Sequence, residues 1–274
     1  MATTRDIRKR IRSVGNTQKI TRAMKMVAAA RFRRAQERVH QAAPYAEKIE
    51  ELLADMSRDA GHPLFTARPV ERRALVIFTS DRGLCGSFNA GLIRRVEREA
   101  AELILIGRKA ISYFSRRSVK VAKTLPAFWG SFSYANVAAF ASELAGSFAD
   151  GTFDQIDLAY NHFVSVITQR PKIVTLVPMT PVAQKAEPSG ERLYEPDRDS
   201  ILNVLVPRAL EVRVYAACLH SLASEHGARM TAMDSATRNA KEMIDSLTLA
   251  MNRARQATIT KELVEIISGA EALK

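Results

Sequence analysis

Apolar residues near both ends of the chain recur at alternating steps of four and three, the spacing of a helix that packs lengthwise on another helix. Between residues 7 and 56 this spacing gives fifteen positions, of which only Gln18, Thr21 and Lys25 are polar. Between residues 219 and 258 it gives twelve positions, nine of them apolar. A lone helix gains little stability in water, so we expect the two terminal helices to pair as a long antiparallel coiled coil.

Proline and glycine indicate where these helices begin, break and end. Pro44 predicts a kink or a division of the first helix near residue 43. Pro207 is typical of a helix start and Gly269 of a helix end. We therefore expect coiled-coil helices within residues 1–60 and 207–274.

The segment between them, residues 70–200, shows a different pattern. Two short apolar runs read as buried strands, and each is followed by a stretch that suits a helix, which is typical of a mostly parallel sheet. The expected strands are Ala74–Thr79, Leu103–Ile106, Gln155–His162 and Lys172–Val177. Two of the expected helices begin near Ser87 and near Arg108, and a third spans Tyr134–Phe148. The segment Ala183–Glu195 reads as an exposed loop. The fold class is thus α/β, with a central Rossmann-like domain between the helices.

Composition supports a globular chain. Its 274 residues are 47% hydrophobic and 26% charged, and no apolar run approaches the roughly 20 residues that cross a bilayer. The two cysteines, Cys85 and Cys218, lie far apart and in no cysteine–histidine cluster. These features argue against a membrane span, a disulfide scaffold and a structural zinc site, and they favour a reducing compartment.

The formal net charge of +12 is concentrated at the N-terminus. The first 40 residues contain twelve basic and two acidic side chains, which leaves 29 basic and 27 acidic for the rest. Such a segment suits a nucleic-acid-binding arm, a membrane-surface helix or a transit peptide. Cleavage is not expected, because the apolar spacing runs unbroken through the basic stretch. A basic-arm coiled-coil protein that binds nucleic acid, with strong salt dependence, stays an alternative.

One glycine-rich turn, Ser80–Asn89, could hold a phosphate after a strand. It lacks both the Gly-x-x-x-x-Gly-Lys-Ser/Thr and the Gly-x-Gly-x-x-Gly patterns, so we interpret it as structural; an α/β enzyme that binds phosphate there is the second alternative. No catalytic motif or metal-ligand spacing occurs, and no cofactor is expected. The remaining interpretations are a buried thiol at Cys85, a packed imidazole at His226 and a surface pair of Asp234 with Arg238.

Four motifs resemble the gamma subunit family of F-type ATP synthases. The stretches Arg5–Arg8 and Asn16–Ala30 are similar to the opening helix of that family, and Ser224–Asp234 with Asn252–Leu263 to its closing helix. The turn Asp81–Gly86 and the segment Leu193–Asp197 match as well. The motifs occur in family order and span nearly the whole chain.

The resemblance implies a non-catalytic rotor. In the family, the paired terminal helices form a shaft inside a ring of alternating alpha and beta subunits, while the globular middle stands on the c-subunit ring and holds the epsilon subunit. Proton-driven rotation then couples to ATP synthesis at the beta subunits. The implied location is the cytoplasmic side of the bacterial plasma membrane, peripheral and reached only through partners, with no nucleic acid bound.

Matching motif positions also imply site residues. Contacts with the alpha and beta ring are implied for Met24, Lys25, Arg229, Arg255, Gln256 and Thr260. Basic residues of the first helix would meet an acidic loop of the beta subunits. Foot contacts with the epsilon subunit and the c ring are implied for Tyr194 and Glu195. The chain departs from the family in a shorter link between Ala90 and Leu103 and in Ser87, where the family repeats glycine, and these departures leave open a paralogue with a modified stalk.

Overall fold

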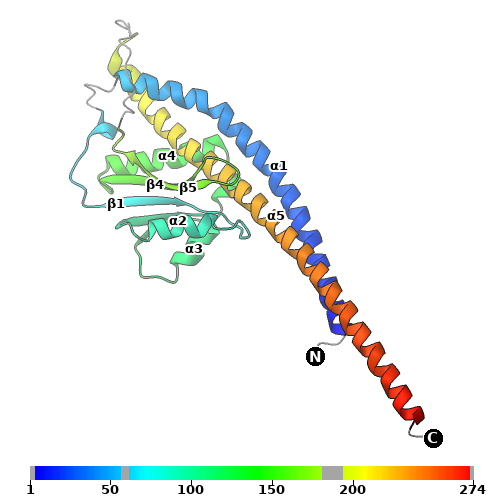
Figure 1. The fold of residues 1–274 in the computed structure, drawn as a ribbon. Helices are drawn as coiled ribbons and strands as arrows, with labels where there is room; N and C mark the ends of the chain where they lie inside the picture. Colours follow the sequence, from blue (N-terminus) through cyan, green and yellow to red (C-terminus); the bar gives the residue numbers. More distant parts are fainter. Residues whose placement is uncertain (1–3, 57–61, 181–193, 272–274) are drawn as a thin grey trace. The chain divides into compact units, whose positions relative to one another are not determined.

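The computed structural model describes residues 4–56, 62–180 and 194–271 (Figure 1). The chain forms two compact units: Met1–Ala28 with Met230–Lys274, and Ala29–Arg229. The predicted loop 183–195 falls almost wholly outside the described residues. The division into domains at 1–60, 70–200 and 207–274 stays a prediction.

Two long helices dominate the secondary structure. Helix α1 spans Thr4–Met56 and helix α5 spans Arg198–Glu271. The predicted division of the first helix near residue 43 is wrong, because α1 continues through Pro44. Pro44 is exposed, so the carbonyl of His40 that loses its helical partner can bind water instead, and seam packing on both sides holds the helix together.

The predicted start of the second helix at Pro207 is also wrong. Helix α5 begins nine residues earlier, where Asp197 caps it: Asp197 Oδ1 accepts from the Ser200 N–H at 2.8 Å and Asp197 Oδ2 from the Ser200 hydroxyl at 2.7 Å. An aspartate at this position satisfies a free N–H group of the first turn. Pro207 then lies inside the helix on its exposed side, where one missing hydrogen bond is tolerated.

The second unit contains a five-stranded sheet in the order β3-β2-β1-β4-β5. Strands β1, β2, β3 and β4 run parallel, and β5 pairs with β4 antiparallel as a hairpin. Their bounds are β1 Arg73–Phe78, β2 Glu102–Ile106, β3 Val121–Leu125, β4 Gln155–Phe163 and β5 Gln169–Val177. The mostly parallel sheet confirms the predicted fold class, although β3 was not predicted.

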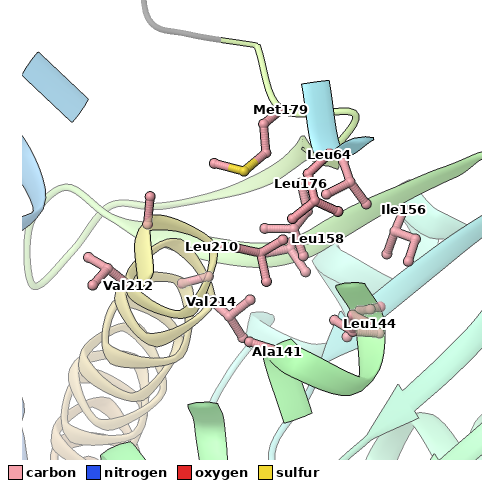
Figure 2. Packing of buried hydrophobic residues seen from close by; sticks show 14 of the residues in the cluster. Leu64, Ala141, Leu144, Ile156, Leu158, Leu176, Met179, Leu210, Val212 and Val214 are labelled. Carbon is pink, nitrogen blue, oxygen red and sulfur yellow. The ribbon is translucent and has the colours of Figure 1, made fainter. Parts of the chain in front are cut away.

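Alternate residues of the central strands enter two different cores. On one face, Leu75, Ile77, Leu103 and Leu105 pack under helices α2 (Phe88–Val96) and α3 (Arg108–Phe114). On the other face the core joins the sheet to helix α4 (Tyr134–Ala149), to residues 46–56 of α1 and to residues 202–218 of α5. Figure 2 shows this second core, with Leu210 of α5 directed at Leu158 of the sheet and Val214 of α5 beside Ala141 of α4. The alternation follows from the two-residue period of a strand.

Within the second unit, α1 and α5 run antiparallel along the sheet. Arg213 forms a two-pronged ion pair with Glu50, with nitrogen–oxygen distances of 2.5 and 2.6 Å. Further along, the Arg198 guanidinium donates to the carbonyl of Met56 at 2.9 Å and so covers the end of α1. These contacts fix the register of the two helices at the sheet.

Candidate functional site

The first unit is a pair of antiparallel helices, residues 4–28 of α1 and 230–271 of α5. Lys25 Nζ lies 2.6 Å from Asp234 Oδ1, and the Thr21 and Thr237 hydroxyls lie 2.8 Å apart. Going back along α1 from Lys25 to Thr21 therefore corresponds to going forward along α5 from Asp234 to Thr237, which makes the two helices antiparallel. In the described part of α1, all fifteen predicted seam positions are buried or half-buried, which confirms the heptad assignment.

Thr21 and Thr237 form a hydrogen-bonded polar layer across the seam. The Thr237 hydroxyl donates to Thr21 Oγ1, and the Thr21 hydroxyl donates to the carbonyl of Gln18 at 3.0 Å. Thr21 is buried, and its hydroxyl is fully paired. A paired polar layer in an apolar seam fixes the register, because any sliding of one helix along the other would bury these hydroxyls against apolar side chains.

Lys25, one turn beyond Thr21 on α1, is half-buried and forms a separate pair across the seam. Its ammonium group binds Asp234, which also lies 3.4 Å from Arg238 at the next turn. The hydrogen bond from Lys25 lowers the pKa of Asp234 below its ordinary value, and Arg238 adds to the effect. The predicted pair of Asp234 with Arg238 is therefore present, but the nearer partner is Lys25, which the sequence interpretation did not foresee.

The end of α5 has no second helix beside it among the described residues. The register of Lys25 with Asp234 places Thr4, the first described residue of α1, opposite about residue 255. Every residue from 255 to 269 is exposed. The large apolar side chains among them are Ile259, Leu263, Val264, Ile266 and Ile267. An apolar helix surface open on all sides needs a partner to cover it.

The predicted ring contacts of this unit fall into two groups. Lys25 binds Asp234 and Met24 precedes Lys25 on α1, whereas Arg255, Gln256 and Thr260 lie on the bare end of α5. The rise of a helix separates the groups by roughly 30 Å. The three residues at the bare end are exposed and Met24 is half-buried.

Arg229, the sixth predicted ring contact, belongs to the second unit and is buried, with 8% of its surface exposed. Its guanidinium binds Glu225 at 2.6 Å and donates to the carbonyls of Arg82 at 3.0 Å and Gly83 at 3.3 Å. Burial raises the pKa of Glu225, and the charge of Arg229 partly offsets that rise. Arg229 thus fastens the turn after β1 to α5.

That turn is held closed by its own side chains. Asn89 Oδ1 accepts from the Ser80 N–H at 3.0 Å, and Asp81 Oδ1 accepts from the Arg108 N–H at the start of α3. Leu84 and Gly86 adopt left-handed backbone conformations, with φ of 61° and 58°. Cys85 is buried as predicted, and burial raises the pKa of its thiol. These internal bonds favour the structural interpretation of the turn over a phosphate site.

The two predicted foot residues lie just before α5. Tyr194 is half-buried against the larger core, and Glu195 is exposed. Among the described residues no group of three metal-binding side chains occurs, and no helix is long and apolar enough to cross a membrane.

A sequence profile of the family described as ATP synthase matches residues 3–273. The ATP synthase gamma chain of Desulforamulus reducens is 45% identical over 283 aligned residues, and that of Moorella thermoacetica is 46% identical over 283, with both chains covered completely in each case. The chain belongs to the ATP synthase gamma chain family.

Solved structures agree with this family assignment. A chain in the cryo-EM structure of the Tetrahymena thermophila mitochondrial ATP synthase central stalk and c ring is 27% identical, with a TM-score of 0.62 over 79% of this chain and 99% of that one. A chain of the Euglena gracilis mitochondrial ATP synthase rotor has a TM-score of 0.68 over 93% of this chain and 98% of that one. At 17% identity the second likeness shows the shared fold.

In this gamma chain family member, sequence reasoning missed the inward-facing partners of the polar layer. Thr237 is one of the three polar positions among the twelve of the second seam, and Thr21 is one of three among the fifteen of the first. A threonine at one polar position in each of two antiparallel seams is a signal that could have predicted the contact between Thr21 and Thr237, because buried hydroxyls require hydrogen-bond partners.

Proposed function

We propose that this chain works as the rotating central shaft of an F-type ATP synthase, couples proton-driven rotation of the c ring to ATP synthesis at the beta subunits, and makes no chemical bond itself. The observation that carries the proposal is the family match over the full length, with relatives about 45% identical. The bare apolar end of α5 supports it, because such a surface requires an enclosing partner.

The helix pair has features that a shaft needs. A paired coiled coil with a fixed register resists sliding of one helix along the other, so a torque on one part passes along both helices. Coupling further requires that the shaft contact the subunits around it unequally. A contact that is identical in every state of the surrounding subunits cannot shift the equilibrium between those states. Because the two helices of the pair differ in sequence, the shaft presents a different surface to each subunit around it.

The ring contacts we propose act at two levels. Arg255, Gln256 and Thr260 would bind the alpha and beta ring directly from the exposed end of α5. Met24 and Lys25 would form the second level, where Lys25 must serve both Asp234 and the partner. The burial of Arg229 favours an indirect role, in which it holds the turn Asp81–Gly86 in the shape that a partner binds.

The remaining partners follow from the same proposal. The epsilon subunit and the c ring would contact the second unit, with Tyr194 and Glu195 at the foot. The Tetrahymena chain that this one resembles comes from a central stalk and c-ring assembly. The complex is membrane-associated, and we place this subunit peripherally on the cytoplasmic side of the plasma membrane. The relatives give the nucleic-acid alternative no support.

The test is ATP hydrolysis and single-molecule rotation by purified alpha and beta subunits, with and without this chain. Rotation that depends on the chain supports the proposal. A variant that ends at residue 254 removes residues 255–269, which are all exposed, together with the last five residues, so the helix pair should survive while torque and hydrolysis rate fall. No complex with alpha and beta, together with tight salt-sensitive DNA binding, contradicts the proposal and favours the basic arm.

A further inference from the structure

A cavity of about 390 Å³ lies within the second unit, where β4, β5, α1 and α5 meet. Pockets that hold small molecules in proteins have volumes of roughly 300–1,000 Å³. The sheet contributes two adjacent register pairs to the lining, Leu158 with Val174 and Tyr160 with Lys172. Because side chains alternate along a strand, all four lie on one face of the sheet, the face that packs on α5.

The cavity is closed at one end and open at the other. Leu158 and Leu176 are buried and close the inner end, whereas Lys172 is exposed at the outer end. Arg213 of α5 and Glu50 of α1 also line the cavity, and their two-pronged ion pair holds the two helices together. A cavity whose walls are already fixed loses little conformational entropy when a ligand binds.

The lining carries one positive charge that is not neutralised within it. Its charged side chains are Lys172, Arg213 and Glu50, and the last two neutralise each other. His220 also lines the cavity. Burial lowers the pKa of His220 to about 4, and the neighbouring His162 and Lys172 add to the effect, so this imidazole is uncharged at neutral pH. The charge of Lys172 therefore sets the sign of the cavity.

We propose that this cavity binds a small organic acid, whose single negative charge pairs with Lys172 and whose apolar body packs on Leu158 and Val174. The inference goes beyond the proposed function and does not depend on it, because the site lies within this chain alone. Removal of the apolar body from water supplies affinity, and the charged hydrogen bond to the ammonium group selects an anion. The same ammonium group repels an organic cation of equal size.

The experiment titrates the full chain with 1-anilinonaphthalene-8-sulfonate and with its uncharged analogue 1-anilinonaphthalene, and it follows their fluorescence. We expect one sulfonate per chain, bound at least tenfold more tightly than the analogue. Lys172→Gln should weaken the sulfonate about tenfold and leave the analogue unchanged, which is the effect expected for one charged hydrogen bond. Lys109→Gln makes the same change of charge at an exposed residue of α3 and should alter neither dye. Equal affinity for the two dyes, or equal losses in the two variants, overturns the proposal.

A second variant pair tests the location of the site. Val174→Phe fills the cavity and should weaken both dyes at least tenfold, whereas Val121→Phe, at a residue 39% exposed on β3, should weaken neither. Unchanged binding to Val174→Phe overturns the assignment to this cavity. Near-ultraviolet circular dichroism checks that both variants fold.

Competition on the unaltered chain tests the ligand class even where Val174→Phe does not fold. Sodium octanoate should displace the sulfonate dye at a concentration about tenfold lower than 1-octanol or octylamine requires, because only octanoate combines an apolar body with a negative charge. Displacement by 1-octanol or octylamine at the same concentration as octanoate overturns the selection of an acid.

Discussion

Lys25 Nζ and Asp234 Oδ1 lie 2.6 Å apart on opposite helices, although 209 positions separate the two residues in the sequence. Lys25 is also a proposed contact with the alpha and beta ring. Lys25 therefore has a partner within its own chain, Asp234, as well as the proposed partner in the ring. Substitutions at the two residues can separate these two roles.

Charge reversal at this pair distinguishes the two roles of Lys25. Lys25→Glu places two carboxylates together, so the melting temperature should fall, and adding Asp234→Lys should restore it. If Lys25 also binds the ring, the double variant regains its melting temperature but not its rate of coupled ATP hydrolysis. Recovery of both would contradict an external role for Lys25.

The threonine layer should contribute specificity more than stability. Thr237→Val leaves Thr21 bonded to the Gln18 carbonyl, so each single change should cost roughly 0.5–1.5 kcal/mol in the free energy of unfolding. The double variant Thr21→Val with Thr237→Val should cost less than the sum of the two. Urea unfolding of all four proteins measures this coupling, and strict additivity would mean that the hydroxyls do not interact.

Arg229→Met should destabilise the isolated chain by roughly 3–5 kcal/mol, because it leaves the buried Glu225 without its partner. Glu225→Gln in the same background should recover part of the loss, since a neutral amide is less costly to bury. Urea unfolding without any partner subunit measures both. A stable Arg229→Met chain that fails only in the complex would instead indicate direct contact with the ring.

Two glycines should respond to alanine in opposite directions. At Gly107, with φ of 89°, a Cβ would lie 2.1 Å from the Thr79 carbonyl oxygen, so Gly107→Ala should cost at least about 3 kcal/mol. At Gly146, inside α4, a Cβ meets nothing, so Gly146→Ala should stabilise by about 0.5–1 kcal/mol. Thermal unfolding compares them, and equal effects would contradict the geometry at Gly107.

Acid should weaken the second unit. Burial lowers the pKa of His220 and of His226 from 6.5 to about 4, and neighbouring cations add to both shifts. The unfolded chain then binds more protons between pH 6.5 and pH 4, so the stability present above pH 6.5 is lost as the pH falls through this range. The loss is at most about 3 kcal/mol for His226 and less for the more solvent-accessible His220.

The variant His220→Gln with His226→Gln should flatten this pH dependence. His40→Gln serves as the matched control, because His40 lies exposed on α1 and its replacement should leave the slope as it is. Urea midpoints at pH 7.5, 6 and 5 give the slopes. An unchanged slope in the double variant would assign the acid sensitivity to other groups.

The sequence predicted what repeats along the chain and missed what depends on distant partners. The seams were readable because burial in a coiled coil follows a fixed period, and the buried strands because four or five apolar residues stand together. Strand β3 was missed because Val121–Leu125 is an edge strand with mostly exposed side chains. The start of α5 was missed because Pro207 is a strong local signal for the start of a helix. The actual cap, Asp197 bonded to Ser200, is a weaker signal in the sequence.

The ring contacts themselves stay predictions, and the structure shows only where their residues lie. Motif positions suggested Arg255, Gln256 and Thr260, which lie exposed together on the end of α5. Nothing local in the sequence shows that Arg229 faces inward toward the carbonyls of Arg82 and Gly83, because that contact requires the turn after β1 to lie against α5.

The bare end of α5 has a mechanical consequence. Up to about residue 254 bending is resisted by two helices with a fixed register, but beyond it the described chain supplies only one. A single helix is more easily bent and twisted than a pair, so the rigidity of that stretch must come from whatever encloses it. In the proposed assembly, the surrounding subunits would then act as a brace for the last turns of the shaft as well as the bearing in which they rotate.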